Sequence, residues 1–252
     1  MLSKPRLSDQ HIAEFKRDGF VIYRQAFNYN EAELFKQWAG EMEEMKEESG
    51  KHWVYHEKSK INGQTQLINR IEYIFPFHQG FAELNEALKT PAGQLLGEEA
   101  VLFKEKINFK MPGGDGFKPH QDSQAGWQKY ADYFVSVMVS IDEATIENGC
   151  LQLVAGHQND GLYKEWEPLT EEDMADMEFK YCPTNPGDIV LFDCYTPHAS
   201  EPNESNRIRR AYFATYNRLS EGDHIAEYYA DKHRSYPPDI DRIPGKEYVF
   251  RV

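Results

Sequence analysis

The residues in this sequence best suited to chemistry are two histidines and an aspartate. His120 and Asp122 stand two positions apart, and His198 follows 76 positions after Asp122. In an extended segment, residues i and i+2 project to the same side, so His120 and Asp122 can reach one metal ion. Two imidazoles and a carboxylate form the facial ligand set of non-haem Fe(II) oxygenases, which leaves positions open for a co-substrate and oxygen. The spacing predicts an Fe(II) site, provided that His198 arrives from another strand.

A possible anchor for the co-substrate follows the second histidine. Arg209 lies eleven positions beyond His198, on a strand-like segment, and can bind a carboxylate such as that of 2-oxoglutarate. A zinc hydrolase also uses two histidines and a carboxylate, but it needs a nearby general base and no such arginine. An isolated His-x-Asp is common by chance, and a lone histidine is more often structural. The combination favours an Fe(II)- and 2-oxoglutarate-dependent oxygenase.

Composition narrows the class of protein. The 252 residues are 40% apolar, which is enough for one sizeable domain. The net charge of −14 argues against a nucleic-acid partner, because phosphate binding requires a basic face. There is no apolar run of 18 residues for a membrane span and no signal-peptide pattern at Met1. Three cysteines without Cys-x-x-Cys spacing predict reduced thiols in a cytoplasmic protein. The oligomeric state is left open.

The first hundred residues show mainly helical patterns. Apolar residues at helical spacing predict helices over 8–18, 30–48 and 81–96, with Ser8 and Asn30 as N-caps. A short strand is expected over 20–23. The polar and aromatic stretch 50–65 has no clear period and is predicted to be a loop.

The pattern then changes to short strands. Residues 101–111 alternate, which predicts a strand with two distinct faces: Phe103, Glu105, Ile107 and Phe109 on one, and Lys104, Lys106, Asn108 and Lys110 on the other. A turn over 112–116 follows, and further strands are expected over 133–141, 150–154, 188–192 and 208–217.

Helices first and strands afterwards predict an α+β fold built on a jelly roll, the double-stranded β-helix of cupin-like proteins. We expect one domain over 1–252. Its mainly helical part, 1–100, would pack on a jelly-roll core, 101–217, and a C-terminal extension would occupy 218–252.

Several ordered motifs resemble the phytanoyl-CoA dioxygenase family of Fe(II)/2-oxoglutarate oxygenases. The resemblance covers about 101–217, with a weaker match at 18–21. The stretches that carry it are Lys106–Lys110, Pro119–Asp122, Glu147–Leu151, Pro186–Asp188, His198–Asn203 and Arg209-Arg210.

The resemblance implies a role for each of these site residues. His120, Asp122 and His198 would bind Fe(II), and O2 would react there. Arg209, helped by the Ser200 hydroxyl, would hold the distal carboxylate of 2-oxoglutarate. Asn108 stands where ectoine-hydroxylase-like members place an amide near the co-substrate. Arg210 would face away, because neighbouring strand residues point to opposite sides. Asp122 stands where halogenases of this superfamily lack a carboxylate, so hydroxylation is the expected reaction.

The substrate rests on a narrower resemblance. Within the family, the chain looks most like the 2-aminoethylphosphonate dioxygenase group, at stretches that include 104–110, 120–127, 220–224, 228–232 and 237–240. Hydroxylation of another small metabolite, as in ectoine-like or secondary-metabolite enzymes, is the alternative, and a non-catalytic ligand-binding or metal-storage barrel is a remote one.

Local positive charge would be needed to bind a phosphonate in an acidic protein. Lys104 and Lys106 share a strand face with Asn108 and could face the barrel mouth, although an exposed sheet edge would give the same pattern. Trp127 is a further candidate. Other possible contacts, without a spacing argument, are Arg70, Glu72 and Tyr130.

Overall fold

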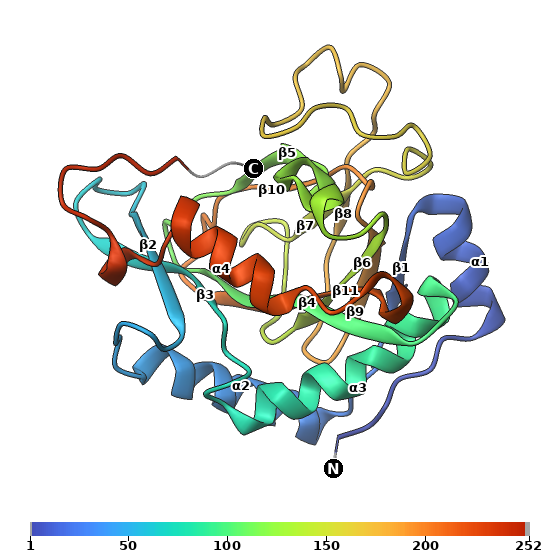
Figure 1. The fold of residues 1–252 in the computed structure, drawn as a ribbon, viewed down its shortest axis with the longest axis horizontal. Helices are drawn as coiled ribbons and strands as arrows, with labels where there is room; N and C mark the ends of the chain where they lie inside the picture. Colours follow the sequence, from blue (N-terminus) through green and yellow to red (C-terminus); the bar gives the residue numbers. More distant parts are fainter. Residues whose placement is uncertain (1, 250–252) are drawn as a thin grey trace.

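The computed structural model describes residues 2–249, and two antiparallel sheets form its centre (Figure 1). The larger sheet has seven strands in the order β1 (Phe20–Tyr23), β9 (Ile189–Asp193), β6 (Phe134–Ser140), β11 (Arg209–Arg218), β4 (Ala100–Lys110), β3 (Gln66–Glu72) and β2 (Trp53–Lys58). The smaller has four, in the order β5 (Phe117–His120), β10 (His198–Ser200), β7 (Leu151–Leu153) and β8 (Lys180–Cys182). The two sheets make the predicted jelly roll within an α+β fold.

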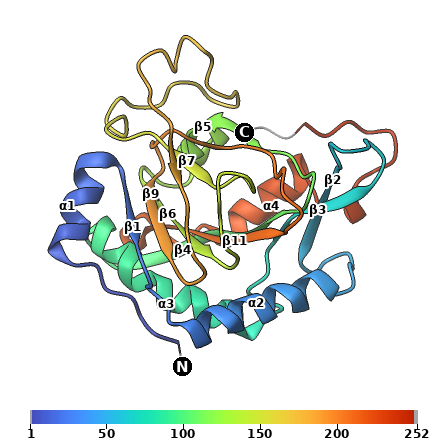
Figure 2. The ribbon, with the colours of Figure 1, turned by 180° about the vertical axis from the view of Figure 1, so that it is seen from behind.

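Two helices cover the outer face of the large sheet. They are α2 (Tyr29–Glu44) and α3 (Gln79–Leu96), which lie below the sheet in Figures 1 and 2. Phe35, Phe81 and Tyr212 are fully buried in the main core between these helices and the sheet. The hydroxyl of Tyr212 donates to Asn85 Oδ1 at 2.7 Å, which satisfies a polar group inside this apolar layer.

Strand β4 has the two faces that its alternation predicts, except at one end. Lys104 and Lys106 face the interior of the jelly roll, while Ile107 and Phe109 join the core under the helices. The pairing with β11 shifts between Thr215 and Tyr216, and this bulge leaves Phe103 outside the regular register. Phe103 packs in a second cluster with Trp127, so the prediction that it shares a face with Ile107 and Phe109 is wrong.

The N-terminal helices begin where capping side chains stand. Helix α1 (Asp9–Asp18) has the predicted Ser8 cap, whereas α2 is capped by Asn28 rather than Asn30. Asn28 Oδ1 accepts from the backbone N–H of Asn30 and Glu31, and the Glu31 side chain accepts from Asn28 N–H in return. This capping box fixes the start of the helix two residues before the predicted position.

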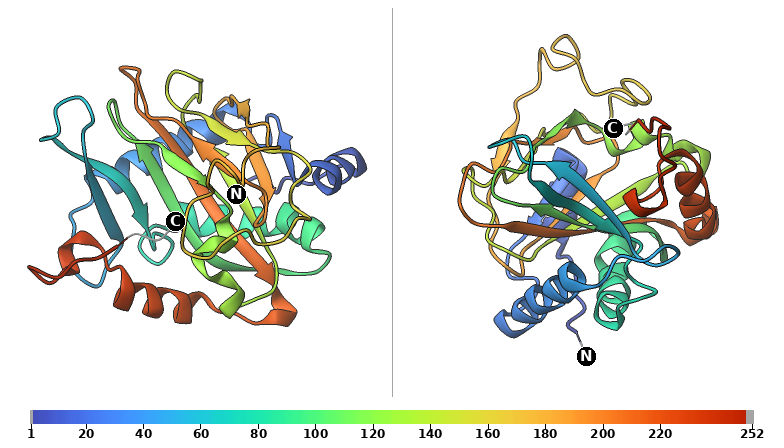
Figure 3. Two further views of the ribbon diagram at one scale, coloured as in Figure 1. Left: turned by 90° about the horizontal axis from the view of Figure 1, so that it is seen from above. Right: turned by 90° about the vertical axis from the view of Figure 1, so that its left-hand side faces the viewer.

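The predicted loop over 50–65 is wrong, because its centre forms β2. This strand pairs with β3, and β3 pairs with β4, so the hairpin extends the large sheet. Trp53, Val54 and Tyr55 are buried in the strand. The region 1–100 is therefore less helical than predicted. Its hairpin lies at one edge of the large sheet, as the left view of Figure 3 shows.

One helix follows the last strand of the large sheet. Helix α4 (Ile225–Ser235) packs on β4 and contributes Tyr228 and Tyr229 to the second cluster. A long irregular segment between β7 and β8 rises above the small sheet in Figure 1. Within residues 2–249, no helix combines the length and apolar character needed to cross a membrane.

Candidate active site

The two histidines are brought together by one pair of strands. His120, at the end of β5, is the direct pairing partner of His198 on β10, and their ring centroids lie 4.2 Å apart. Asp122 opens the short 3-10 helix η1 (Asp122–Ala125) directly after β5, and its Oδ1 lies 3.8 Å from His198 Nε2. One potential ligand atom from each of the three residues lies within 4.8 Å of the others. Residues 2–249 hold no second cluster of this kind.

The outer nitrogen of each imidazole has a backbone partner. His120 Nδ1 lies 2.7 Å from the carbonyl of Lys118, and His198 Nδ1 lies 3.0 Å from that of Thr196. A carbonyl only accepts, so each Nδ1 carries the proton and each Nε2 keeps its lone pair for a ligand. Burial lowers the pKa of both histidines, which favours the neutral form that binds metal.

The carboxylate of Asp122 is oriented by a hydroxyl from the opposite sheet. Ser136 Oγ on β6 donates to Asp122 Oδ2 at 2.7 Å and lies 3.0 Å from Thr215 Oγ1 on β11. Burial acts to raise the pKa of Asp122, but His198 and Lys104 outweigh it and hold the pKa below its usual value. The three groups therefore present two neutral imidazoles and a carboxylate, which suits an Fe(II) ion.

Arg209 and Arg210 face opposite sides of β11, as alternation predicts. The Arg209 side chain is buried beside His198 and Ser200 in a narrow inner cavity, and its Nη2 donates to the carbonyl of Gly149. Arg210 lies on the far face, where Nε and Nη2 bind the two oxygens of Asp142 at 2.8 and 3.0 Å.

A lysine that sequence reasoning left out of the site stands behind this cavity. Lys110 is the register partner of Arg209, and its Nζ donates to Ser200 Oγ at 2.8 Å. Burial and the charge of Arg209 lower the pKa of Lys110 to about 6. The alternation of residue types along β4 already placed Lys110 on the same face as Asn108, so the sequence pattern could have indicated this site residue.

The inner cavity holds about 40 Å³ and reaches the three metal-binding candidates. Asn108 lines it, and its Oδ1 is buried with no hydrogen-bond partner among the described residues. The Nε of Arg209 is likewise buried and unpaired there. A buried donor or acceptor that lacks a hydrogen bond lowers the stability of the fold. Both atoms are therefore suited to bind a polar molecule in the cavity.

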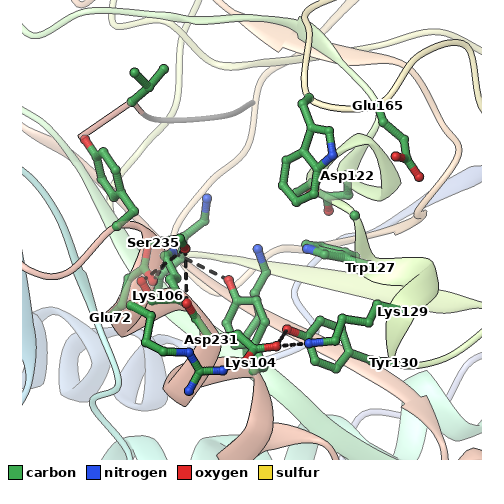
Figure 4. Close-up of a pocket in the computed structure, with 18 of the residues that line it drawn as sticks. Glu72, Lys104, Lys106, Asp122, Trp127, Lys129, Tyr130, Glu165, Asp231 and Ser235 are labelled. Atoms are coloured by element: carbon green, nitrogen blue, oxygen red, sulfur yellow. Dashed lines mark hydrogen bonds and ion pairs between the residues drawn. The ribbon is translucent and has the colours of Figure 1, made fainter. Parts of the chain in front are cut away.

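A second, larger cavity of about 1070 Å³ opens from His120 and Asp122 to the surface. Figure 4 shows Lys104 and Lys106 between Glu72 on one side and Trp127 on the other. All of the proposed substrate contacts line this cavity, namely Lys104, Lys106 and Trp127 with Arg70, Glu72 and Tyr130. The exposed-edge alternative for the two lysines is therefore wrong.

The two lysines share an unusual electrostatic position. Within residues 2–249, neither ammonium group has a hydrogen bond or an ion pair, and both lie over aromatic rings. Lys104 Nζ is 4.1 Å from the ring centroid of Trp127, and Lys106 Nζ is 5.5 Å from that of Phe117. Burial, together with the charge of Lys104, lowers the pKa of Lys106 to about 7. Such a pair of buried cations is suited to an anionic ligand.

The other wall of the cavity comes from α4, where sequence reasoning assigned no site residue. Tyr228 and Lys232 line it, and Lys232 Nζ binds Glu72 Oε2 at 2.5 Å. No spacing within the sequence links residues 72 and 232, so only the fold could reveal this contact.

Residues 15–211 match the phytanoyl-CoA dioxygenase (PhyH) family, and the chain belongs to it. The protein is an Fe(II)- and 2-oxoglutarate-dependent dioxygenase, as the resemblance implies.

Two relatives match most of the chain. A 2-aminoethylphosphonate dioxygenase from uncultured bacterium HF130_AEPn_1 is 40% identical over 240 residues, which cover 93% of this chain and 91% of that protein. A methylphosphonate hydroxylase from Gimesia maris is 36% identical, with 96% and 92% covered. The solved structure of EctD from S. alaskensis with 2-oxoglutarate and 5-hydroxyectoine has a TM-score of 0.75 at 24% identity, covering 85% of this chain and 77% of that one, and shares the fold.

Proposed function

We propose that this protein hydroxylates a C–H bond of a small organophosphonate, with 2-aminoethylphosphonate as the leading candidate. The observation that carries the substrate class is the pair of unpaired ammonium groups, Lys104 and Lys106, beside His120 and Asp122. The relatives with 40% and 36% identity, which are named for two different phosphonates, support the same class.

Iron would be bound by Nε2 of His120, Nε2 of His198 and the carboxylate of Asp122. With Fe(II), 2-oxoglutarate and O2 bound, decarboxylation to succinate and CO2 supplies the oxidant that inserts one oxygen atom into a C–H bond. The chain's own task is to fix the ligands. The carbonyls of Lys118 and Thr196 hold the imidazole protons on Nδ1, and the Ser136 hydroxyl holds the carboxylate.

The co-substrate would extend from the iron into the inner cavity. Arg209 would bind its distal carboxylate in a charge-assisted contact, and Ser200 would donate a hydrogen bond to the same group. Lys110, which binds Ser200 Oγ, would orient that hydroxyl. Asn108 lines the same cavity, and its side-chain N–H groups would be the atoms that donate to the co-substrate, because the oxygens of 2-oxoglutarate can only accept.

The substrate would occupy the larger cavity, with its phosphonate group near Lys104 and Lys106 and the aromatic face of Trp127 alongside. Residues 1–252 would form one oxygenase domain, because each of its three predicted parts contributes a residue to this cavity. These residues are Arg70 from 1–100, Lys104 from 101–217 and Lys232 from 218–252. The proposed place of action is the cytoplasm, because Fe(II) and three buried, unpaired cysteines fit a reducing compartment.

The test is a substrate panel with Fe(II), 2-oxoglutarate and O2. We expect 2-aminoethylphosphonate or methylphosphonate to yield a product heavier by one oxygen atom, with one succinate formed per product. Lys106→Met should raise the KM for the phosphonate about 10- to 100-fold, since one charged contact is lost. Lys36→Met, on the helix that covers the opposite face of the sheet, is the matched control. Turnover of ectoine or an acyl-CoA in place of any phosphonate would show that the substrate class is wrong.

A further inference from the structure

Helix α4 places a third ammonium group on the wall of the larger cavity. We propose that Lys232 binds one phosphonate oxygen, alongside Lys104 and Lys106, and that Glu72 positions it. The inference rests on the proposed function and adds a specificity residue from the part of the chain beyond residue 211, where the family match ends.

Lys232 lines the same cavity as Lys104 and Lys106. Its side chain is 14% exposed. Lys232 Nζ and Lys104 Nζ lie 5.8 and 5.9 Å from the centroid of one ring, that of Tyr228. Helix α4 itself packs on β4, the strand that carries Lys104 and Lys106. The three ammonium groups therefore come from two packed elements around one space.

Glu72 fixes Lys232 without using all of its donors. The bond from Lys232 Nζ to Glu72 Oε2 is 2.5 Å long, and the other carboxylate oxygen accepts from Arg70 Nε at 2.7 Å. The contact between Lys232 Nζ and the Tyr228 hydroxyl is 3.5 Å long. An ammonium group has three N–H donors, so at least one remains for a ligand in the cavity.

Among the least exposed charged side chains of the cavity, cations outnumber carboxylates. Arg70, Lys104, Lys106 and Lys232 are cations, while Glu72 is the carboxylate among them and already lies between two of the four. With every group charged, these five side chains sum to +3, which a phosphonate dianion reduces to +1. The more exposed charged residues of the cavity are not counted, namely Lys129, Glu165, Asp231, Arg234 and Lys246. Asp122 is left out of this count because it is assigned to the metal.

The number of donors also matches the ligand. A phosphonate has three oxygen atoms on phosphorus, and three ammonium groups can each bind one. A carboxylate has two oxygens and one charge, so it would leave one of these cations unpaired. Burial lowers the pKa of Lys232 to about 7, and the adjacent Glu72 carboxylate opposes that effect and favours the charged, donating form.

The test measures binding to the protein loaded with Fe(II) and 2-oxoglutarate without oxygen, by calorimetry with 2-aminoethylphosphonate. Lys232→Met should raise the Kd about 10- to 100-fold, while the Kd of 2-oxoglutarate stays within about twofold of wild type. Lys232→Arg, which keeps the charge, should recover most of the affinity. Lys129→Met is the matched control, because it breaks another ion pair to α4, with Asp231. The Lys129 side chain also lines the cavity, but it is 56% exposed. It should change the Kd less than about threefold.

Each result has a distinct meaning. If the wild-type protein neither binds nor hydroxylates a phosphonate, the proposed function fails. If it does both, but Lys232→Met binds with the wild-type Kd, the role of Lys232 is refuted. An equal loss in Lys129→Met and Lys232→Met would also refute it, because attachment of α4 would then be the cause. Thermal unfolding of each variant confirms that it is folded when the Kd is measured.

Discussion

Two neighbouring arginines on β11 allow the proposed co-substrate site to be tested with an internal control. Arg209→Met and Arg210→Met change adjacent positions of one strand, but the side chains lie in different surroundings. Arg209 is 4% exposed and lines the inner cavity, while Arg210 binds Asp142 on the other face of the sheet. We expect opposite outcomes for 2-oxoglutarate affinity and for stability.

The magnitudes follow from the partners of each guanidinium. Arg209 donates to the Gly149 carbonyl, its Nε has no partner among the described residues, and burial lowers its pKa to about 10. Leaving the buried carboxylate of 2-oxoglutarate without this cation should cost about 2–5 kcal/mol, or roughly 30-fold to several-thousand-fold in Kd. The free energy of unfolding should stay the same or rise, because a buried and incompletely paired charge is removed.

Arg210→Met should show the reverse. It removes both side-chain hydrogen bonds from Arg210 to Asp142. The bond from the backbone N–H of residue 210 to the same carboxylate is kept. Loss of one member of a largely buried pair should lower the free energy of unfolding by about 1–3 kcal/mol. The affinity for 2-oxoglutarate should stay near wild type.

Two measurements decide between these outcomes. The first is an oxygen-free titration of the Fe(II)-loaded protein with 2-oxoglutarate. The visible charge-transfer absorption expected when 2-oxoglutarate binds to Fe(II) gives the Kd. Urea unfolding of the unloaded protein gives the stability. A larger loss of 2-oxoglutarate affinity in Arg210→Met than in Arg209→Met would refute the assignment of Arg209 as the anchor.

Two further changes test the metal site and the buried core. His198→Ala removes one of the three proposed ligands, so iron retained after desalting should fall well below one equivalent; stoichiometric iron with full turnover would contradict the assignment. Glu105→Gln should stabilise the protein above about pH 6. Burial raises the pKa of Glu105 to about 8, while its Oε1 accepts from the backbone N–H of Ile74 and Phe75. As the pH rises above the unfolded pKa, the unfolded chain ionises Glu105 while the folded protein keeps it protonated, so folding loses free energy until the pH reaches about 8. Wild type should therefore lose on the order of 2–3 kcal/mol between pH 4.5 and 7, a slope that Glu105→Gln should lack in urea unfolding. Equal slopes in the two proteins would mean that Glu105 is ionised in the fold.

Much of the site follows from local rules that a sequence contains. The two-residue period of a strand placed Lys104, Lys106 and Asn108 on one face of β4, and it separated Arg209 from Arg210. The ordered motifs indicated the family, and with it the fold and cofactors. These features depend on neighbours in the chain or on a pattern of residue types, so they can be read without knowing which strands pair.

Other features depend on contacts between distant segments. The stretch 50–65 lacks a clear period, and β2 forms within it because β3 is available as a partner and is itself paired to β4. The bulge opposite Thr215 and Tyr216 moves Phe103 to a different cluster, against the alternation of its own strand. In both cases, the packing of neighbouring strands overrides the local pattern.

The sequence by itself determined the metal-binding candidates, the proposed co-substrate arginine and the class of enzyme. The tertiary structure alone decided which side chains meet in the wall of the proposed substrate cavity. Glu72 and Lys232 are 160 positions apart, and they meet because α4 packs on β4 beside the hairpin of β2 and β3. A strand's period fixes which way a side chain points, but the partner that it meets is set by packing across the whole chain.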